Sequence, residues 1–342
     1  MIKTLADVAA YAGVSMATAS RALSGKPGVS AATRQAVKEA SRKLDYQPSA
    51  IAASLRKQST GVLGLLVPDI TNPFFPAIMQ GLEREFAKHD LAVMLMDAEE
   101  RVDVEAARVE ALLRRRVDAL IVSPVHPTHS AKALRRAGRH VPVIQIDRRT
   151  LEDADFVGVD HAWAITKVIE HLRHSGARSA WFVGLVAGNL PIEQRASAYI
   201  AACVHHELRY AAPIAAERAD LPSGRAVVRR MLKDGSLPDA IVCGNDLIAA
   251  GVLTELREAG VRCPEDVLLT GYDDAAPIAE ILGLTTVRQP LSDLGREAAR
   301  LLRNASEAPR TVLLTPAVIV RSTSARYAGG RQGDVGPAVS AA

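Results

Sequence analysis

The stretch Val14-Ser-Met-Ala-Thr-Ala-Ser-Arg21 decides the fold of the first part of the chain. Ser15 is a residue type that commonly caps helices, so the pattern predicts a helix that begins at Met16. The side chains from Met16 to Arg21 are mostly small or polar, which lets such a helix approach another surface closely. These properties are typical of a helix that recognises DNA.

Another helix is predicted just before this stretch. Thr4-Leu5-Ala6-Asp7 has capping-box spacing, with Asp in the place usually taken by Glu or Gln. Apolar residues then repeat at helical spacing, at Leu5, Val8, Ala9 and Ala12. Gly13 follows, and a residue that adopts positive φ freely allows the next helix to leave at a steep angle.

A third helix is predicted to open at Ser30-Ala31-Ala32-Thr33. Its apolar positions complete a small core with Ala19 and Leu23 of the second helix, through Val37, Ala40 and Leu44. The three helices indicate a helix-turn-helix domain. An ordinary helical bundle without any DNA-binding role accounts for the helix count equally well. The residues after the third helix are needed to distinguish the two interpretations.

Positive charge is concentrated at the N-terminal end. The 342 residues carry a formal net charge of +4, and residues 1–60 hold nine Lys and Arg against three Asp and Glu. A basic segment of this kind is where a polyanion would bind. With 48% hydrophobic residues, the chain is globular and long enough for two or three domains.

Cysteine usage and the apolar segments indicate a cytoplasmic protein. Cys203, Cys243 and Cys263 are few and far apart, which favours reduced thiols over a disulfide framework. No signal-peptide pattern precedes the first helix, and no apolar run approaches the roughly 20 residues of a membrane span. We expect no membrane partner.

A short conditional helix is predicted after the three-helix unit. Pro48-Ser49-Ala50-Ile51-Ala52-Ala53-Ser54-Leu55 begins with a helix-breaking Pro and a capping Ser. The helix from Ala50 to Lys57 would be too short to be stable alone, because isolated helices need roughly 12–15 residues. With this motif, residues 3–60 resemble the DNA-binding headpiece and hinge helix of the LacI/GalR family of bacterial transcription regulators.

The resemblance implies how DNA would be bound. In that family, two hinge helices pair across a dimer axis in the minor groove, and the leucine matched by Leu55 is wedged between base pairs. Arg21 is the best candidate for a direct base contact, bidentate to guanine. The residues expected to contact an operator are Thr4, Leu5, Ser15, Met16, Ala17, Thr18, Ser20, Arg21, Ser30, Thr33, Ala52 and Leu55.

From Gly61 onward, apolar runs alternate with longer amphipathic stretches, which indicates βαβ units and parallel sheets. Strands are expected at Val62–Val67, Leu91–Met96, Ala119–Val122, Val141–Ile146, Ala180–Val183, Ala240–Cys243 and Val267–Thr270. Helices are expected at Phe75–His89, Val104–Arg115, Ile165–His174, Arg225–Lys233 and Leu247–Ala259. The fold class is α/β, and the resemblance implies two Rossmann-like lobes similar to periplasmic sugar-binding proteins of type I.

The expected domains are a headpiece (1–46), a hinge helix and linker (47–60), a two-lobed ligand-binding and dimerisation core (61–325) and a disordered tail (326–342). Within the core, the N-lobe is expected at about 61–160 and 289–325, and the C-lobe at about 161–288. The tail is rich in Gly and Ala and lacks leucine heptads, so nothing suggests a tetramerisation helix. We expect a homodimer.

Polar and aromatic residues follow the predicted strands, where open α/β sheets bind ligands. Carboxylates beside Arg, Asn and Gln satisfy sugar hydroxyls, and aromatic faces cover the apolar side of a sugar ring. The resemblance implies a ligand site at Asn72, Phe74, Phe75, Asp147, Arg148, Arg195, Asn245, Asp273 and Gln289. Two departures from the family pattern are Ala198, where Gly is usual, and the absence of an aromatic residue around Ala219–Gly224.

Each candidate also has a structural interpretation. Phe74 and Phe75 could pack in the core, and Asp147-Arg148 could be a solvated strand end. We assign Asp273 to the ligand and Asp274 to a structural role. Trp163 and Trp181 are expected in the core or at the lobe interface. The nine His and three Cys show no metal-ligand spacing, so neither a metal nor another cofactor is expected.

The sequence therefore predicts a sugar-responsive regulator, most simply a repressor, that binds a palindromic double-stranded operator as a homodimer. Lobe closure on a sugar would change whether the hinge helices can meet and fold on DNA. A transport-type sugar-binding protein would explain residues 61–325 but not the basic headpiece. An enzyme on the same scaffold lacks support, because no Gly-rich dinucleotide loop, nucleophile elbow or metal motif is present.

Overall fold

The computed structural model describes residues 3–46, 59–304, 306 and 308–325. These residues form two compact units, divided between Gly61 and Val62. The predicted hinge helix, with Ala52 and Leu55, and the predicted tail lie outside the described residues. None of the described helices has the length and apolar character needed to cross a membrane.

The first unit is a three-helix domain with the predicted helices, α1 (Leu5–Tyr11), α2 (Met16–Leu23) and α3 (Ala31–Lys43). The capping box is confirmed, since the Asp7 carboxylate accepts from the Thr4 amide at 2.7 Å and the Thr4 hydroxyl accepts from the Asp7 amide. Gly13 turns the chain between α1 and α2 with φ of +65°. The core contains Val8, Ala9, Ala19, Ala22, Val37 and Ala40.

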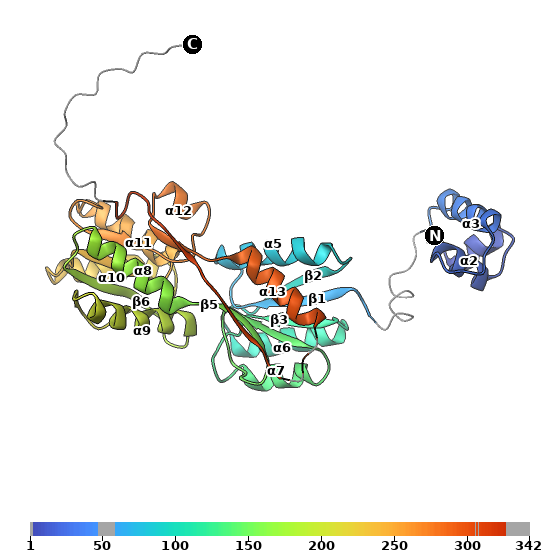
Figure 1. The fold of residues 1–342 in the computed structure, drawn as a ribbon, viewed down its shortest axis with the longest axis horizontal. Helices are drawn as coiled ribbons and strands as arrows, with labels where there is room; N and C mark the ends of the chain where they lie inside the picture. Colours follow the sequence, from blue (N-terminus) through green and yellow to red (C-terminus); the bar gives the residue numbers. More distant parts are fainter. Residues whose placement is uncertain (1–2, 47–58, 305, 307, 326–342) are drawn as a thin grey trace, which may run out of the picture. The chain divides into compact units, whose positions relative to one another are not determined.

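The second unit begins with a six-stranded parallel sheet, which we call the first lobe. Its order is β12-β5-β4-β3-β1-β2, with bounds β1 (Val62–Val67), β2 (Ala92–Asp97), β3 (Ala119–Val122), β4 (Val143–Ile146), β5 (Asp155–Val159) and β12 (Thr311–Leu314). One face is covered by α5 (Phe74–Ala87) and α13 (Leu291–Arg303), and the other by α6 (Val102–Arg114) and α7 (Ala131–Gly138) (Figure 1). Apolar strands buried on both faces produce this arrangement.

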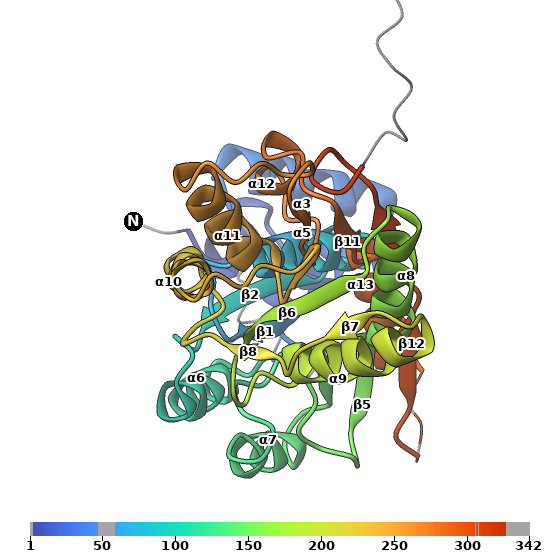
Figure 2. The ribbon, with the colours of Figure 1, turned by 90° about the vertical axis from the view of Figure 1, so that its left-hand side faces the viewer.

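The second lobe has a smaller sheet of order β10-β9-β6-β7, to which β8 also pairs through β6. The strands are β6 (Ser179–Leu185), β7 (Arg209–Tyr210), β8 (Ile214–Ala215), β9 (Ala240–Cys243) and β10 (Leu268–Thr270). Helices α8 (His161–His174) and α9 (Leu190–His205) cover one face, and α10 (Leu221–Lys233) and α11 (Asp246–Glu258) cover the other (Figure 2). The short helix α12 (Ile278–Ile281) packs beside α11.

The last segment of the core, residues 317–323, does not lie in the lobe to which the sequence assigned it. The chain returns to the first lobe through α13 and β12, as expected, and then leaves it again. Strand β13 (Ala317–Ile319) pairs antiparallel with β11 (Thr286–Arg288), and the Thr323 carbonyl accepts from the Leu269 amide of the second lobe. The assignment of all of 289–325 to the first lobe is therefore wrong for 317–323, because these residues hydrogen-bond to second-lobe backbone.

One of the two tryptophans also differs from expectation. Trp181 packs against the core of the second lobe, as predicted. The prediction for Trp163 is wrong, since its side chain is 37% exposed on the first turn of α8. Asp160 caps that turn by accepting from the Trp163 amide at 2.9 Å, which starts α8 four residues earlier than expected and turns Trp163 outward.

Candidate functional site

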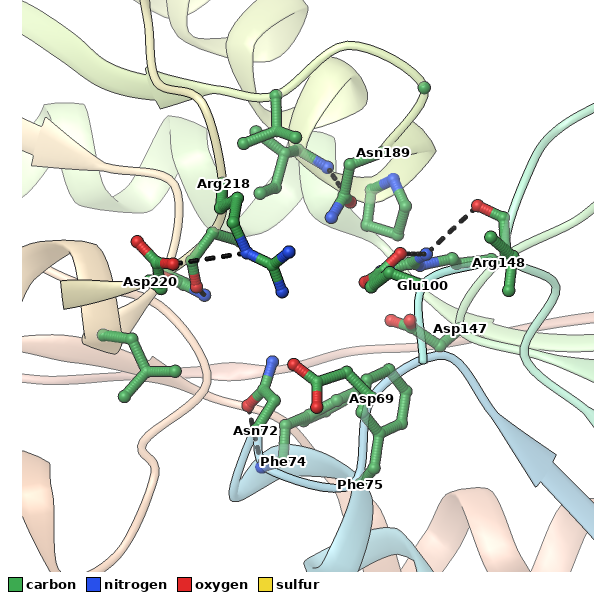
Figure 3. Close-up of a pocket in the computed structure, with 18 of the residues that line it drawn as sticks. Asp69, Asn72, Phe74, Phe75, Glu100, Asp147, Arg148, Asn189, Arg218 and Asp220 are labelled. Carbon is green, nitrogen blue, oxygen red and sulfur yellow. Dashed lines mark hydrogen bonds and ion pairs between the residues drawn. The ribbon is translucent and has the colours of Figure 1, made fainter. Parts of the chain in front are cut away.

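A cavity of about 400 Å³ lies between the two lobes, at the carboxyl ends of their parallel strands. Figure 3 shows side chains from both lobes facing this space. The predicted ligand residues that line it are Asn72, Phe74, Phe75, Asp147, Arg148, Arg195, Asn245 and Asp273. Gln289 does not line the cavity. Its Nε2 donates to Asp273 Oδ1 at 2.8 Å, so it contacts a residue that does.

The aromatic residues belong to both the core and the cavity wall. Phe74 and Phe75 are 4% and 3% exposed, pack in the first-lobe core and line the cavity at the start of α5. Their rings meet edge to face with centroids 5.2 Å apart. The Asn72 side-chain oxygen accepts from the Phe74 amide at 3.1 Å, which fixes this turn below the cavity (Figure 3).

Arg148 is held by Glu100 in a two-pronged ion pair. Its Nη2 and Nη1 donate to the two Glu100 oxygens at 3.0 and 3.3 Å, and Nη1 also donates to the Val125 carbonyl. Arg148 is 6% exposed and its Nε is buried without a hydrogen-bond partner. Asp147, just before it, adopts the left-handed region with φ of +60°. Burial raises the pKa of the Asp147 carboxyl.

Arg195 organises the second-lobe side of the cavity. Its Nη1 donates to the Gly244 carbonyl at 2.8 Å, and its Nη2 lies 3.5 Å from Asp273 Oδ1. The guanidinium stacks on the Tyr272 ring, 3.6 Å from the centroid. Burial raises the pKa of Asp273 to about 7, while Arg195 opposes that rise. Arg195 therefore joins Gly244, Tyr272 and Asp273 in one buried network.

Two neighbouring residues at the start of α11 have structural contacts. The Asn245 oxygen accepts from the Ile248 amide at 2.9 Å, and its Nδ2 donates to the Ala219 carbonyl at 3.1 Å. Asp246, which the sequence did not single out, accepts from the Thr286 hydroxyl and the Ala275 amide, both at 2.7 Å. Asp246 is 1% exposed, and burial raises its pKa to about 8.

Asp246 gives stability an unusual pH dependence. An unfolded Asp has a pKa of about 3.9, so between about pH 4 and pH 8 the unfolded chain has lost a proton that folded Asp246 keeps. The contribution of this group to the free energy of unfolding therefore falls as the pH rises through that window and levels off above it. Asp246→Asn, which mimics the protonated side chain, should flatten the decline.

Denaturant unfolding of the two proteins at several pH values between about 5 and 8 measures this effect. The stability of Asp246→Asn relative to the parent should rise with pH. Parallel curves would show that Asp246 is ionised in the folded protein.

The structure adds polar lining residues that the sequence did not reveal, namely Glu100, Asn189, Glu217, Arg218 and Asp220. Glu100 follows β2, Asn189 follows β6, and Glu217, Arg218 and Asp220 follow β8. All of them obey the same rule that located Asp147. Asp69, which follows β1, also faces the cavity (Figure 3).

In the three-helix unit, the candidate DNA contacts lie at helix starts. Thr4, Ser15 and Ser30 are exposed N-caps, and the Ser15 and Ser30 side chains accept from the amides of Thr18 and Thr33. Met16 is 59% exposed, and Ala17 and Arg21 are exposed, whereas Thr18, Ser20 and Thr33 are half-buried. Leu5 packs partly against the headpiece core. Exposed hydroxyl side chains at helix N-termini suit phosphate contacts.

A helix-turn-helix unit and a two-lobed parallel-sheet core with a polar cavity define the class of ligand-responsive DNA-binding proteins. Residues 4–49 match the family described as bacterial regulatory proteins, lacI family, and residues 60–323 match periplasmic binding proteins and sugar binding domain of LacI family. The chain belongs to the LacI family of bacterial transcription regulators.

Curated relatives span the whole architecture. The chain is 32% identical to the ribose operon repressor of Halalkalibacterium halodurans over 87% of this chain and 89% of that protein. It is 31% identical to the regulator reg1 of Streptomyces lividans, with 97% and 99% covered, and 31% identical to the regulator MalR of Streptomyces coelicolor, with 97% and 99% covered.

Solved structures share the fold. A lac repressor dimer bound to operator and an anti-inducer matches with a TM-score of 0.86 at 24% identity, over 95% of this chain and 99% of that one. A complex of the transcriptional regulator CelR with cellobiose matches with a TM-score of 0.69 at 27% identity, over 94% and 99%. The two-lobed core is therefore shared with sugar-bound members of the family.

Proposed function

We propose that this chain is a cytoplasmic repressor that binds a palindromic operator as a homodimer and responds to a small sugar between its lobes. The observation that carries the proposal is one chain with both a helix-turn-helix unit and a polar inter-lobe cavity. The family consists of transcription regulators rather than enzymes, and several relatives are named repressors.

The proposed operator contacts follow from exposure and chemistry in the headpiece. Hydroxyls and helix N-termini around Thr4, Ser15 and Ser30 bind phosphates and set the orientation. Arg21 contacts guanine through its guanidinium, and Met16 and Ala17 make apolar contacts in the major groove. From the resemblance, Ala52 and Leu55 contact the minor groove at the centre of the site.

The proposed sugar contacts use both lobes. Asp147 and Asp273 accept from hydroxyls, while Arg148 and Arg195 donate to them, which suits groups that are donors and acceptors at once. Both arginines line the cavity, and the Nε of each has no hydrogen-bond partner in the protein. Asn72, Asn245 and Gln289 position this set, and Phe74 and Phe75 cover the apolar side of the ring.

Sugar binding and operator binding are proposed to be coupled through lobe closure. By linkage, the effector changes operator affinity by the same factor as the operator changes effector affinity, typically about 1–3 kcal/mol. The direction of the coupling, induction or corepression, is decided by which lobe arrangement the operator-bound dimer favours.

Deletion of residues 1–60 tests whether the headpiece binds DNA and the core binds the effector. A gel shift should show loss of sequence-specific binding to the chain's own promoter region, because the basic headpiece is gone. The truncated core should still show an effector-dependent rise in Tm, which is the control for folding. Sequence-specific DNA binding by the truncated chain would contradict the role of the headpiece.

A further inference from the structure

The cavity between the lobes has an excess of acidic side chains. Its ionisable walls contain three guanidinium groups, from Arg148, Arg195 and Arg218, and the His126 imidazole, whose pKa burial lowers, against the carboxylates of Asp69, Glu100, Asp147, Glu217, Asp220 and Asp273. Burial raises the pKa of Asp273 to about 7, so this carboxyl carries less than a full charge at neutral pH, and burial also raises the pKa of Asp147. The other four carboxylates still outnumber the guanidinium groups.

Each of the three guanidinium groups is already paired with a carboxylate. Arg148 pairs with Glu100 at 3.0 Å, Arg195 lies 3.5 Å from Asp273, and Arg218 lies 3.4 Å from Asp220. Among the described residues, Asp69, Asp147 and Glu217 have no arginine or lysine within ion-pair distance. The unbalanced charge that faces the cavity is therefore negative (Figure 3).

Side-chain oxygens also accept from backbone amides at the helix starts that face the cavity. Asn72 accepts from the Phe74 amide at the start of α5, Asn189 accepts from the Ile192 amide of α9, and Asn245 accepts from the Ile248 amide of α11. The Gly188 amide donates to Glu193 at 2.8 Å. Backbone donors of this kind bind phosphate in other proteins, and here protein oxygens already occupy several of them.

Arginine N–H groups without a protein partner remain at the cavity on Arg148, Arg195 and Arg218, and each can donate to a hydroxyl. Arg148 and Arg195 are 6% and 3% exposed, both line the cavity, and both have a buried Nε without a partner. A single N–H donates to one hydroxyl oxygen, and that hydroxyl in turn donates to a neighbouring carboxylate such as Asp69 or Asp147. A carboxylate or a phosphate dianion has no proton to donate and would face these carboxylates with like charge.

We propose that the effector is a sugar without phosphate or carboxylate groups, and that the cavity rejects the anionic derivative of any sugar it binds. An amine in place of a hydroxyl is accepted, because a protonated amine donates to the same carboxylates. This inference rests on the proposed function, since it specifies the charge of the ligand in that same site.

Matched sugars test the charge of the effector with the full chain. Thermal shift followed by calorimetry compares ribose with ribose 5-phosphate, and glucose with glucosamine, glucose 6-phosphate and gluconate; maltose and cellobiose extend the neutral set. Each neutral or amino sugar that binds should bind at least tenfold more tightly than its anionic partner. A phosphorylated or acidic sugar that binds more tightly than its neutral partner overturns the inference while the proposed sugar response survives. If no sugar of either kind binds, the proposed function itself fails.

The variant Asp69→Asn tests whether the negative charge of the cavity causes the preference for neutral over anionic sugars. Asparagine keeps the oxygen that accepts from Thr71, and removes one negative charge that faces the cavity. The affinity ratio between a neutral sugar and its phosphate should fall at least threefold in this variant. Asp153 is an exposed carboxylate of the first lobe outside this cavity, and Asp153→Asn is the matched control. It changes the net charge equally and should leave the affinity ratio unchanged. Equal ratios in the parent and both variants would overturn the assignment to cavity charge.

Discussion

Arg148→Ala is expected to weaken effector binding about 100-fold and to leave operator binding intact. Arg148 is buried at the cavity wall, and its guanidinium is fixed by the two oxygens of Glu100 and by the Val125 carbonyl. Hydrogen bonds from a charged group contribute about 1.5–3 kcal/mol each, and the change also leaves Glu100 facing the ligand without its counter-ion. A loss of about 3 kcal/mol corresponds to a factor above 100 in Kd.

Calorimetry with the effector and a gel shift with and without it measure the two functions. Arg149→Ala is the matched control, because the neighbouring guanidinium points to Leu151, Glu152 and Thr311 and does not line the cavity. Arg149→Ala should keep the effector response. An unchanged response in Arg148→Ala would place the ligand elsewhere.

The sequence located Arg148 but not its partner, for a physical reason. The residue after a buried parallel strand must lie at the carboxyl edge of the sheet, so Asp147 and Arg148 could be assigned from β4 alone. Glu100 lies 48 residues away, in a loop after β2, and the pairing depends on β1 and β3 separating β2 from β4 in the sheet. Strand order is set by tertiary packing. The spacing of apolar residues along the sequence predicts where strands lie but not which strands are neighbours.

Local capping explains why α8 and α10 begin earlier than expected. Helix α10 starts at Leu221 rather than Arg225, because the Asp220 carboxylate accepts from the Ser223 amide and Pro222 fits the first turn. Apolar periodicity detects the buried face of a helix. A helix predicted from it therefore starts at the first buried residue, after the capping turn. The strands β7 and β8 were missed for another reason: two residues each, half-buried or exposed, give no periodic signal.

Helices α10 and α11 approach each other through two glycines. A Cβ built on Gly251 would clash with the Leu221 carbonyl and lie 2.9 Å from the Arg225 amide, and one built on Gly224 would clash with the Ile248 carbonyl. Backbone atoms cannot move aside as a flexible side chain can. The close packing of these helices on the second-lobe sheet therefore requires the absence of a side chain at both positions.

Gly251→Ala should consequently lower Tm by about 5–10 °C, although alanine is favoured over glycine in a helix interior by about 0.5–1 kcal/mol. Overpacking costs about 1–3 kcal/mol or more, and a clash with backbone belongs at the upper end, so the steric cost exceeds the gain in propensity. Gly138→Ala is the matched control: this glycine ends α7, and its nearest neighbour would be Val143 Cγ2 at 4.0 Å. Thermal unfolding of both variants should give opposite signs, with the Tm of Gly138→Ala unchanged or slightly raised. A Gly251→Ala protein as stable as the parent would mean that α10 and α11 lie further apart, and the loop between β8 and α10, which carries Arg218 and Asp220 at the cavity, would then be placed differently too.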